Sequence, residues 1–194
     1  VSVICEFMDL GLPYTLSINL SPSHFLSEHF PDDITGMLNE CPHEVRDRLI
    51  IEILETTALD DTTTVMKNLS VCRNTGLCIS LDDFGTGQSS LAMLRRLRIY
   101  AIKLDRSLTM RAAHEARAGR VVAQMVSLLH ECGALVLMEG VEDEAAALLA
   151  MDADADLVQG WYFGRPQAEP RPKGHAPDEL TRLPHAFTAL REGQ

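Results

Sequence analysis

Oxygen-bearing side chains recur in this sequence at the ends of short runs of aliphatic residues. Six such runs end in a polar residue, namely Asn19, Glu52, Asp82, Lys103, Glu139 and Gln159. A further acidic residue follows closely in four places, at Glu55, Asp83, Asp105 and Glu142. Carboxylates that are crowded together repel one another unless cations lie between them. The pattern therefore favours a site that binds metal ions.

The types of these side chains narrow the choice of metal and of reaction. The candidate ligands are oxygen donors, and the histidines form neither an HxH nor an HExxH motif. Oxygen ligands suit Mg²⁺, Mn²⁺ or Ca²⁺ rather than zinc. The adjacent Asp82 and Asp83 could bridge or divide two such ions, an arrangement that suits in-line displacement at phosphorus. Lys103 adds a cation that could orient an attacking water or stabilise charge on a phosphate.

A loop of glycine and hydroxyl residues, from Gly85 to Ser90, follows the two aspartates. It leads into a predicted helix whose first N–H groups could contact an anion. Most loops of this composition are plain turns. Its place directly after two candidate metal ligands favours a functional loop.

The aliphatic runs have the character of strands buried on both faces of a parallel sheet. We expect strands at 15–19, 49–52, 77–82, 101–105, 134–139 and 157–159. Helices are expected between them, with apolar faces at Val65, Leu69 and Cys72, at Leu91, Leu94 and Leu97, and at Val121, Val122, Met125, Val126 and Leu129. Such alternation predicts an α/β fold, either a doubly wound sheet or a barrel. In both folds the carboxyl ends of the strands meet at one edge, where the polar residues would converge.

The overall composition bounds the class of protein. The 194 residues are 46% hydrophobic and 23% charged, which predicts a single globular domain over 1–194 with a proline-rich tail over 167–194. A net charge of −11 argues against binding of duplex nucleic acid. No apolar run approaches the roughly 20 residues that span a membrane, and the start shows no secretory signal. The five cysteines form no CxxC pair and predict reduced thiols and a cytoplasmic protein.

A set of ordered motifs makes the chain resemble the EAL domains, which are cyclic di-GMP-specific phosphodiesterases with a TIM-type (β/α) barrel. The resemblance runs from about Ser17 to Pro166. The motifs are Ile18-Asn19-Leu20-Ser21-Pro22, Glu52-Ile53-Leu54-Glu55, Asp82-Asp83-Phe84-Gly85-Thr86-Gly87, Lys103-Leu104-Asp105-Arg106-Ser107, Glu139-Gly140-Val141-Glu142, and Gln159-Gly160 with Arg165-Pro166. Any one of them could be accidental, but the set in this order is specific.

The resemblance implies how the matching residues act on the phosphodiester. Asn19, Glu52 and Asp82 would bind a first Mg²⁺ or Mn²⁺ ion. Asp82 would bridge to a second ion, and Asp83 would complete that second site. Glu139 would serve as a ligand or as the general base, and Lys103 would hold the attacking water. The product would be the linear dinucleotide pGpG.

Four further residues would support the pocket. The resemblance implies that Glu55 braces the loop after Asp83 and that Gln159 and Glu142 support the pocket from its other end. Asp105 could support the pocket or could simply cap a helix. By contrast, the aromatic residues 161–163 are interpreted as core or interface rather than as a surface for stacking guanine. The acidic residues at 152, 154 and 156 predict a solvated turn.

The chain departs from the family pattern in three respects. Leu54 stands where the family usually has Thr, and Met138 where it usually has Ala; both would be packing changes. The Glu-Ala-Leu motif that names the family belongs near the end of a first strand, and this chain begins after it. A TIM barrel needs about 250 residues. We therefore expect an incomplete barrel that lacks the first-strand region and one metal-binding Glu, and that is inactive or nearly so by itself.

Two alternatives to a hydrolase stay open from the sequence. One is a degenerate or truncated EAL module that binds cyclic di-GMP or a protein partner without hydrolysis. The other is an unrelated metal-dependent barrel enzyme. In the longer protein, a fused GGDEF or sensory domain and a homodimer are compatible with the family, in bacterial second-messenger signalling.

Overall fold

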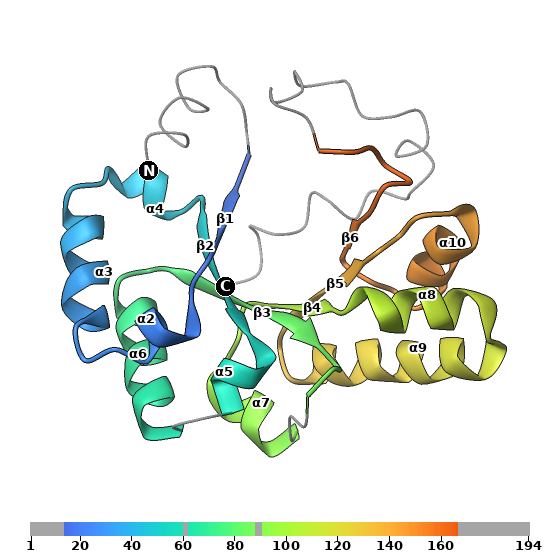
Figure 1. Ribbon diagram of the computed structural model, residues 1–194, viewed down its shortest axis with the longest axis horizontal. Coiled ribbons are helices and arrows are strands. Elements are labelled where there is room, and N and C mark those ends of the chain that lie inside the picture. Colours follow the sequence, from blue (N-terminus) through green and yellow to red (C-terminus); the bar gives the residue numbers. More distant parts are fainter. Residues whose placement is uncertain (1–13, 60–61, 88–90, 167–194) are drawn as a thin grey trace. The chain divides into compact units, whose positions relative to one another are not determined.

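The computed structural model describes residues 14–59, 62–87 and 91–166 (Figure 1). The chain divides into two compact units, residues 1–100 and 101–194. Each unit contains parallel strands joined by helices. The tail over 167–194 and the expected helix-capping residues 89–90 lie outside the described residues.

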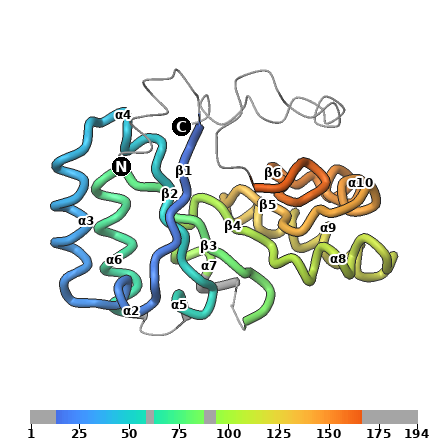
Figure 2. Tube along the Cα trace, turned by 45° about the horizontal axis from the view of Figure 1, so that its top comes forward, coloured from blue at the N-terminus to red at the C-terminus, as the bar shows by residue number. Residues whose placement is uncertain are grey.

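The first unit places three strands side by side in parallel (Figure 2). They are β1 (Leu16–Asn19), β2 (Leu49–Leu54) and β3 (Cys78–Phe84). All three were predicted, but β2 and β3 each end two residues later than expected. Glu52 and Asp82 therefore lie within their strands rather than at the last position.

Helices connect these strands. They are α2 (Pro22–Phe25), α3 (Phe30–Asn39) and α4 (His43–Arg46) after β1, α5 (Glu55–Leu59) and α6 (Thr62–Asn74) after β2, and α7 (Leu91–Leu97) after β3. The predicted apolar face of α6, formed by Val65, Leu69 and Cys72, is buried. Burial raises the pKa of the Cys72 thiol to about 11. This cysteine is therefore a protonated packing residue at neutral pH, in line with the predicted reduced thiols.

The second unit places β4 (Ala101–Leu104), β5 (Leu135–Glu139) and β6 (Leu157–Gln159) in parallel. Helices α8 (Arg106–His114) and α9 (Ala116–Glu131) connect β4 to β5, and α10 (Glu144–Asp152) connects β5 to β6. All of β4 is buried, as expected for a strand covered on both faces. None of the described helices is both long and apolar enough to span a membrane.

Helix α9 carries the apolar stripe that the sequence predicted, with one exception. Val122, Val126 and Leu129 are buried against the unit, whereas Val121 is 55% exposed. Gly133, with a φ of +80°, follows the helix in the left-handed conformation that glycine adopts easily. The chain reverses there and enters β5.

Asp156 anchors the start of β6 to β5. Its Oδ2 accepts a hydrogen bond from the Val136 backbone N–H at 2.7 Å and lies 2.8 Å from His130 Nε2. Its own N–H donates to the Val136 carbonyl at 3.0 Å. The prediction of a merely solvated turn at 152–156 is therefore wrong for Asp156, because the carboxylate is used to fix one strand against the next.

Candidate active site

Three of the predicted metal ligands share one face of the sheet in the first unit. Asn19 and Glu52 are direct register partners on β1 and β2. Glu52 also lies opposite Ser80 of β3, and Asp82 comes two residues after Ser80. Because side chains alternate along a strand, Asp82 extends from the same face as Glu52. Three oxygen donors are thus directed to one side of this sheet.

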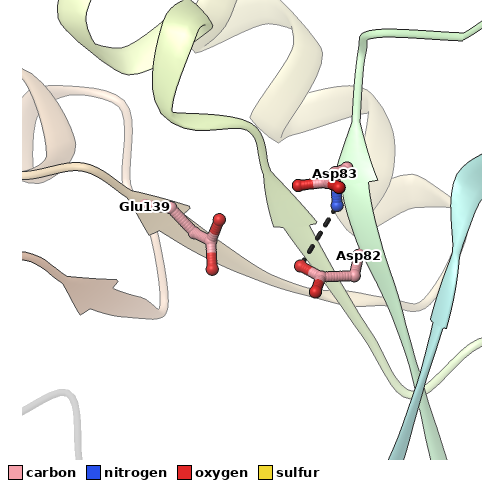
Figure 3. A group of neighbouring side chains, drawn as sticks. All are labelled: Asp82, Asp83 and Glu139. Carbon is pink, nitrogen blue, oxygen red and sulfur yellow. Dashed lines mark hydrogen bonds between the residues drawn. The ribbon is translucent and has the colours of Figure 1, made fainter. Parts of the chain in front are cut away.

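The backbone at Asp83, the residue after Asp82, departs from the extended conformation of a strand. Its φ is +56°, a left-handed conformation that costs a residue with a side chain about 1–2 kcal/mol. The Asp83 backbone N–H donates to Asp82 Oδ1 at 3.1 Å, which links the two residues locally (Figure 3). Figure 3 also shows Glu139, which comes from β5. Backbone strain of this kind collects at functional sites, so the turn at Asp83 supports a functional assignment.

Glu55 holds the glycine loop that follows Asp83. Its Oε2 accepts hydrogen bonds from the backbone N–H groups of Gly85 and Gly87, both at 2.9 Å. A Cβ added at Gly87 would lie 2.9 Å from the Glu55 carboxyl carbon, so any larger residue would push this carboxylate away from the loop. Glu55 is 2% exposed and is the first residue of α5 rather than part of a strand. Its direction is set by this helix start and not by strand alternation.

Replacing Glu55 with alanine should loosen the loop after Asp83. The substitution removes two charge-assisted hydrogen bonds, each of which contributes about 1.5–3 kcal/mol. We expect faster amide hydrogen exchange at Gly85 and Gly87 and a fall in turnover of about 10- to 100-fold. The matched control is Glu55→Gln, which keeps an acceptor oxygen and should preserve more of the loop. Weaker metal binding with an unaltered loop would show instead that Glu55 is itself a ligand.

Lys103 and Glu139 form an ion pair in the second unit. The distance from Lys103 Nζ to Glu139 Oε1 is 2.8 Å, and the side chains are 8% and 17% exposed. Lys103 lies opposite Leu137 on β5, so Glu139, two residues later, extends from the same face. Glu139 is in turn the register partner of Gln159 on β6. The second unit thus presents a largely buried carboxylate and cation near the ends of its strands.

Two of the predicted supporting residues have local structural partners. Asp105 caps α8, where it accepts hydrogen bonds from the Ser107 N–H at 2.9 Å and from the Ser107 hydroxyl. Glu142 pairs with Arg106, with 2.8 Å between Oε1 and Nη2. A Cβ added at Gly140, whose φ is +68°, would overlap the Arg106 side chain. Arg106 therefore covers the turn directly after Glu139, a role that the sequence analysis missed.

A cavity of about 430 Å³ opens beside Glu139 in the second unit. Its wall includes Gln159, Trp161 and Arg165. Tyr162 and Phe163 pack against a buried apolar cluster, as predicted. Trp161 is 52% exposed, so of the predicted alternatives, core or interface, the core is wrong at that position. Met138 is fully buried, which agrees with a packing role.

The chain belongs to the EAL domain family, whose sequence profile matches residues 2–166. It is 31% identical over 164 residues to the cyclic di-GMP phosphodiesterase RocR of Pseudomonas aeruginosa, covering 84% of this chain and 42% of RocR. It is 32% identical over 153 residues to the bifunctional diguanylate cyclase/cyclic di-GMP phosphodiesterase MucR of the same organism, covering 79% of this chain and 22% of MucR. The chain thus spans less than half the length of these curated relatives.

The fold matches that of a solved structure of the PaMucR phosphodiesterase in complex with c-di-GMP. The TM-score is 0.76 at 30% identity, with coverage of 91% of this chain and 68% of that chain. The fold is therefore α/β, a TIM-type (β/α) barrel of the EAL type in incomplete form. This decides between the two α/β arrangements that the sequence left open, in favour of the barrel.

Proposed function

We propose that the protein that carries this chain is a metal-dependent phosphodiesterase, which uses this domain to hydrolyse cyclic di-GMP to the linear dinucleotide pGpG. Membership of the EAL family and the activities of RocR and MucR support this substrate. The observation that carries the proposal is the Lys103–Glu139 ion pair on the same strand ends where the family motifs fall.

The oxygen donors fit one or two Mg²⁺ or Mn²⁺ ions. The proposed ligands are Asn19, Glu52, Asp82, Asp83 and Glu139. Asp82 and Asp83 of the first unit and Glu139 of the second contribute the carboxylates at the ends of their strands. Such ions, when bound, supply an activated water and neutralise the charge that develops on the phosphate. The all-oxygen set agrees with hard divalent cations rather than with zinc.

The remaining roles fall to side chains that surround this set. Lys103 would hold the attacking water by donating to its oxygen, and Glu139 would act as ligand or as general base. Gln159 would support that end of the pocket. Glu55 would hold the loop after Asp83 through the two hydrogen bonds described above, while Glu142 and Asp105 would fix the turns next to Glu139 and Lys103.

The wider setting of the domain is part of the proposal. A single family profile extends from residue 2 to residue 166, which supports treating both units as one domain over 1–194. The longer relatives support a fused GGDEF or sensory domain in the protein that carries this chain. We place that protein in the cytoplasm, in second-messenger signalling, and as a homodimer.

The protein that carries this chain should convert cyclic di-GMP to pGpG when Mg²⁺ or Mn²⁺ is present. Chelation with EDTA should stop turnover, because the carboxylates cannot assemble the site alone, and renewed metal should restore it. Product can be measured by chromatography, and metal binding by calorimetry. Tight binding of cyclic di-GMP with no turnover at any metal concentration would contradict the proposal and favour a non-hydrolytic receptor.

A further inference from the structure

The backbone around Trp161 fixes this residue in an exposed position. The Val141 N–H donates to the Gln159 carbonyl, and the Tyr162 N–H donates to the Val141 carbonyl, both at 3.1 Å. Tyr162 and Phe163 point into the apolar cluster formed by Val141 and its neighbours. Trp161 is left 52% exposed on the wall of the 430 Å³ cavity. A large aromatic side chain on a fixed turn beside a cavity indicates a ligand contact.

Arg165 lies over the ring of Trp161. Its Cζ is 4.3 Å from the ring centroid, well within the range of a cation–π contact. This contact holds the guanidinium against the indole. Arg106 lies 5.9 Å from the same ring but is paired with Glu142. Within the described part of the chain, by contrast, no carboxylate forms an ion pair with Arg165.

The charge of the cavity wall favours a neutral hydrogen-bond acceptor over a phosphate. Arg106 and Arg165 line this cavity together with Glu139 and Glu142, so its wall carries no excess positive charge that would attract a phosphate. Guanine presents two adjacent acceptors, O6 and N7, that match the parallel N–H groups of an arginine. Adenine presents a donor, its N6 amino group, in place of O6 and does not match.

We propose that Arg165, held in place by its contact with Trp161, recognises one guanine base of the cyclic dinucleotide through O6 and N7. The inference rests on the proposed function for the identity of the ligand. It assigns base specificity to two side chains that are neither metal ligands nor general acid–base groups. Trp161 is the positioning residue of the pair, because it holds the guanidinium from which Arg165 donates.

Calorimetry in EDTA, where turnover is suppressed, tests the assignment through the Kd values of cyclic di-GMP and cyclic di-AMP. Arg165→Ala should raise the Kd of cyclic di-GMP about 10- to 100-fold, as expected for loss of one bidentate base contact, and change that of cyclic di-AMP less than about threefold. Arg165→Lys should behave similarly, since an ammonium lacks the planar pair of donors. Trp161→Phe should keep the preference for guanine, and Trp161→Ala should weaken it.

The matched control is Arg111→Ala, which removes an exposed arginine of α8 that pairs only with Glu115 one turn away. It should leave both Kd values unchanged. Equal weakening of both nucleotides by Arg165→Ala would show a phosphate contact and overturn the inference, as would unchanged affinity. A different result is expected if only the proposed function is wrong. The wild-type protein would then bind cyclic di-GMP with the predicted dependence on Arg165 but would not hydrolyse it in Mg²⁺.

Discussion

Asp82→Asn should abolish hydrolysis of cyclic di-GMP, lowering kcat by about 10³-fold or more. The asparagine keeps the Oδ1 acceptor, so the 3.1 Å hydrogen bond from the Asp83 N–H can persist. The shape of the turn is then preserved and only the negative charge is lost. A neutral amide cannot balance two dications that share one ligand, so metal affinity should fall together with turnover.

The measurements for Asp82→Asn are turnover by chromatography of pGpG, metal binding by calorimetry, and thermal melting. Asp32→Asn is the matched control, since it makes the same chemical change at an exposed position in the first turn of α3. The control should keep wild-type activity and lose no more than a few tenths of a kcal/mol of stability through the helix dipole. Normal turnover and metal affinity in Asp82→Asn would remove Asp82 from the proposed metal site.

Lys103→Ala is the second substitution with a large expected effect. It should lower kcat by about 10²–10⁴-fold, the range for loss of a group that assists proton transfer or positions the attacking water. KM should change less than about threefold, because the lysine is proposed to act on the water rather than on the base or ribose. Such a split between kcat and KM marks an interaction made mainly in the transition state.

Stability has to be measured alongside turnover for this variant. Lys103 Nζ lies 2.8 Å from Glu139 Oε1 in a largely buried pair, so its removal leaves a carboxylate without its cation. Bound metal should offset that loss, and the melting temperature of Lys103→Ala should therefore rise more on addition of Mg²⁺ than that of the wild type. Lys67→Ala, at an exposed position on α6, is the control. A rise in KM at unchanged kcat would place Lys103 in substrate binding instead.

The strands could be predicted from the sequence because each is a short aliphatic run. A strand buried on both faces, as β4 is, leaves little choice of side chain. The aliphatic runs located all three strands of each unit. The helices after β1 were missed. Pro22 and Pro31 lie in the first turns of α2 and α3. Proline in a sequence suggests a turn, but it is also favoured in the first turn of a helix. The recurrence of Phe30, Ile34 and Leu38 at helical spacing could have located α3.

The sequence was less informative about residues that depend on tertiary neighbours. The strand before Glu55 was expected to end at Glu52, but it continues to Leu54, and the start of α5 directs the Glu55 side chain. Trp161 follows a strand and precedes two core aromatics, so only the hydrogen bonds to Val141 show that it is exposed. Arg106 contacts Gly140 and Glu142 from another element, and no local pattern indicates such a contact.

The hydrogen bonds of Asp156 also affect how side chains are aligned at the opposite ends of β5 and β6. Glu139 and Gln159 face each other only because β5 and β6 are aligned as they are. A slip of β6 by one residue would turn the Gln159 side chain to the opposite face, away from Glu139. Asp156 opposes that slip through its two hydrogen bonds to Val136. A change far from the chemistry could thus produce a folded protein whose catalytic side chains are misaligned.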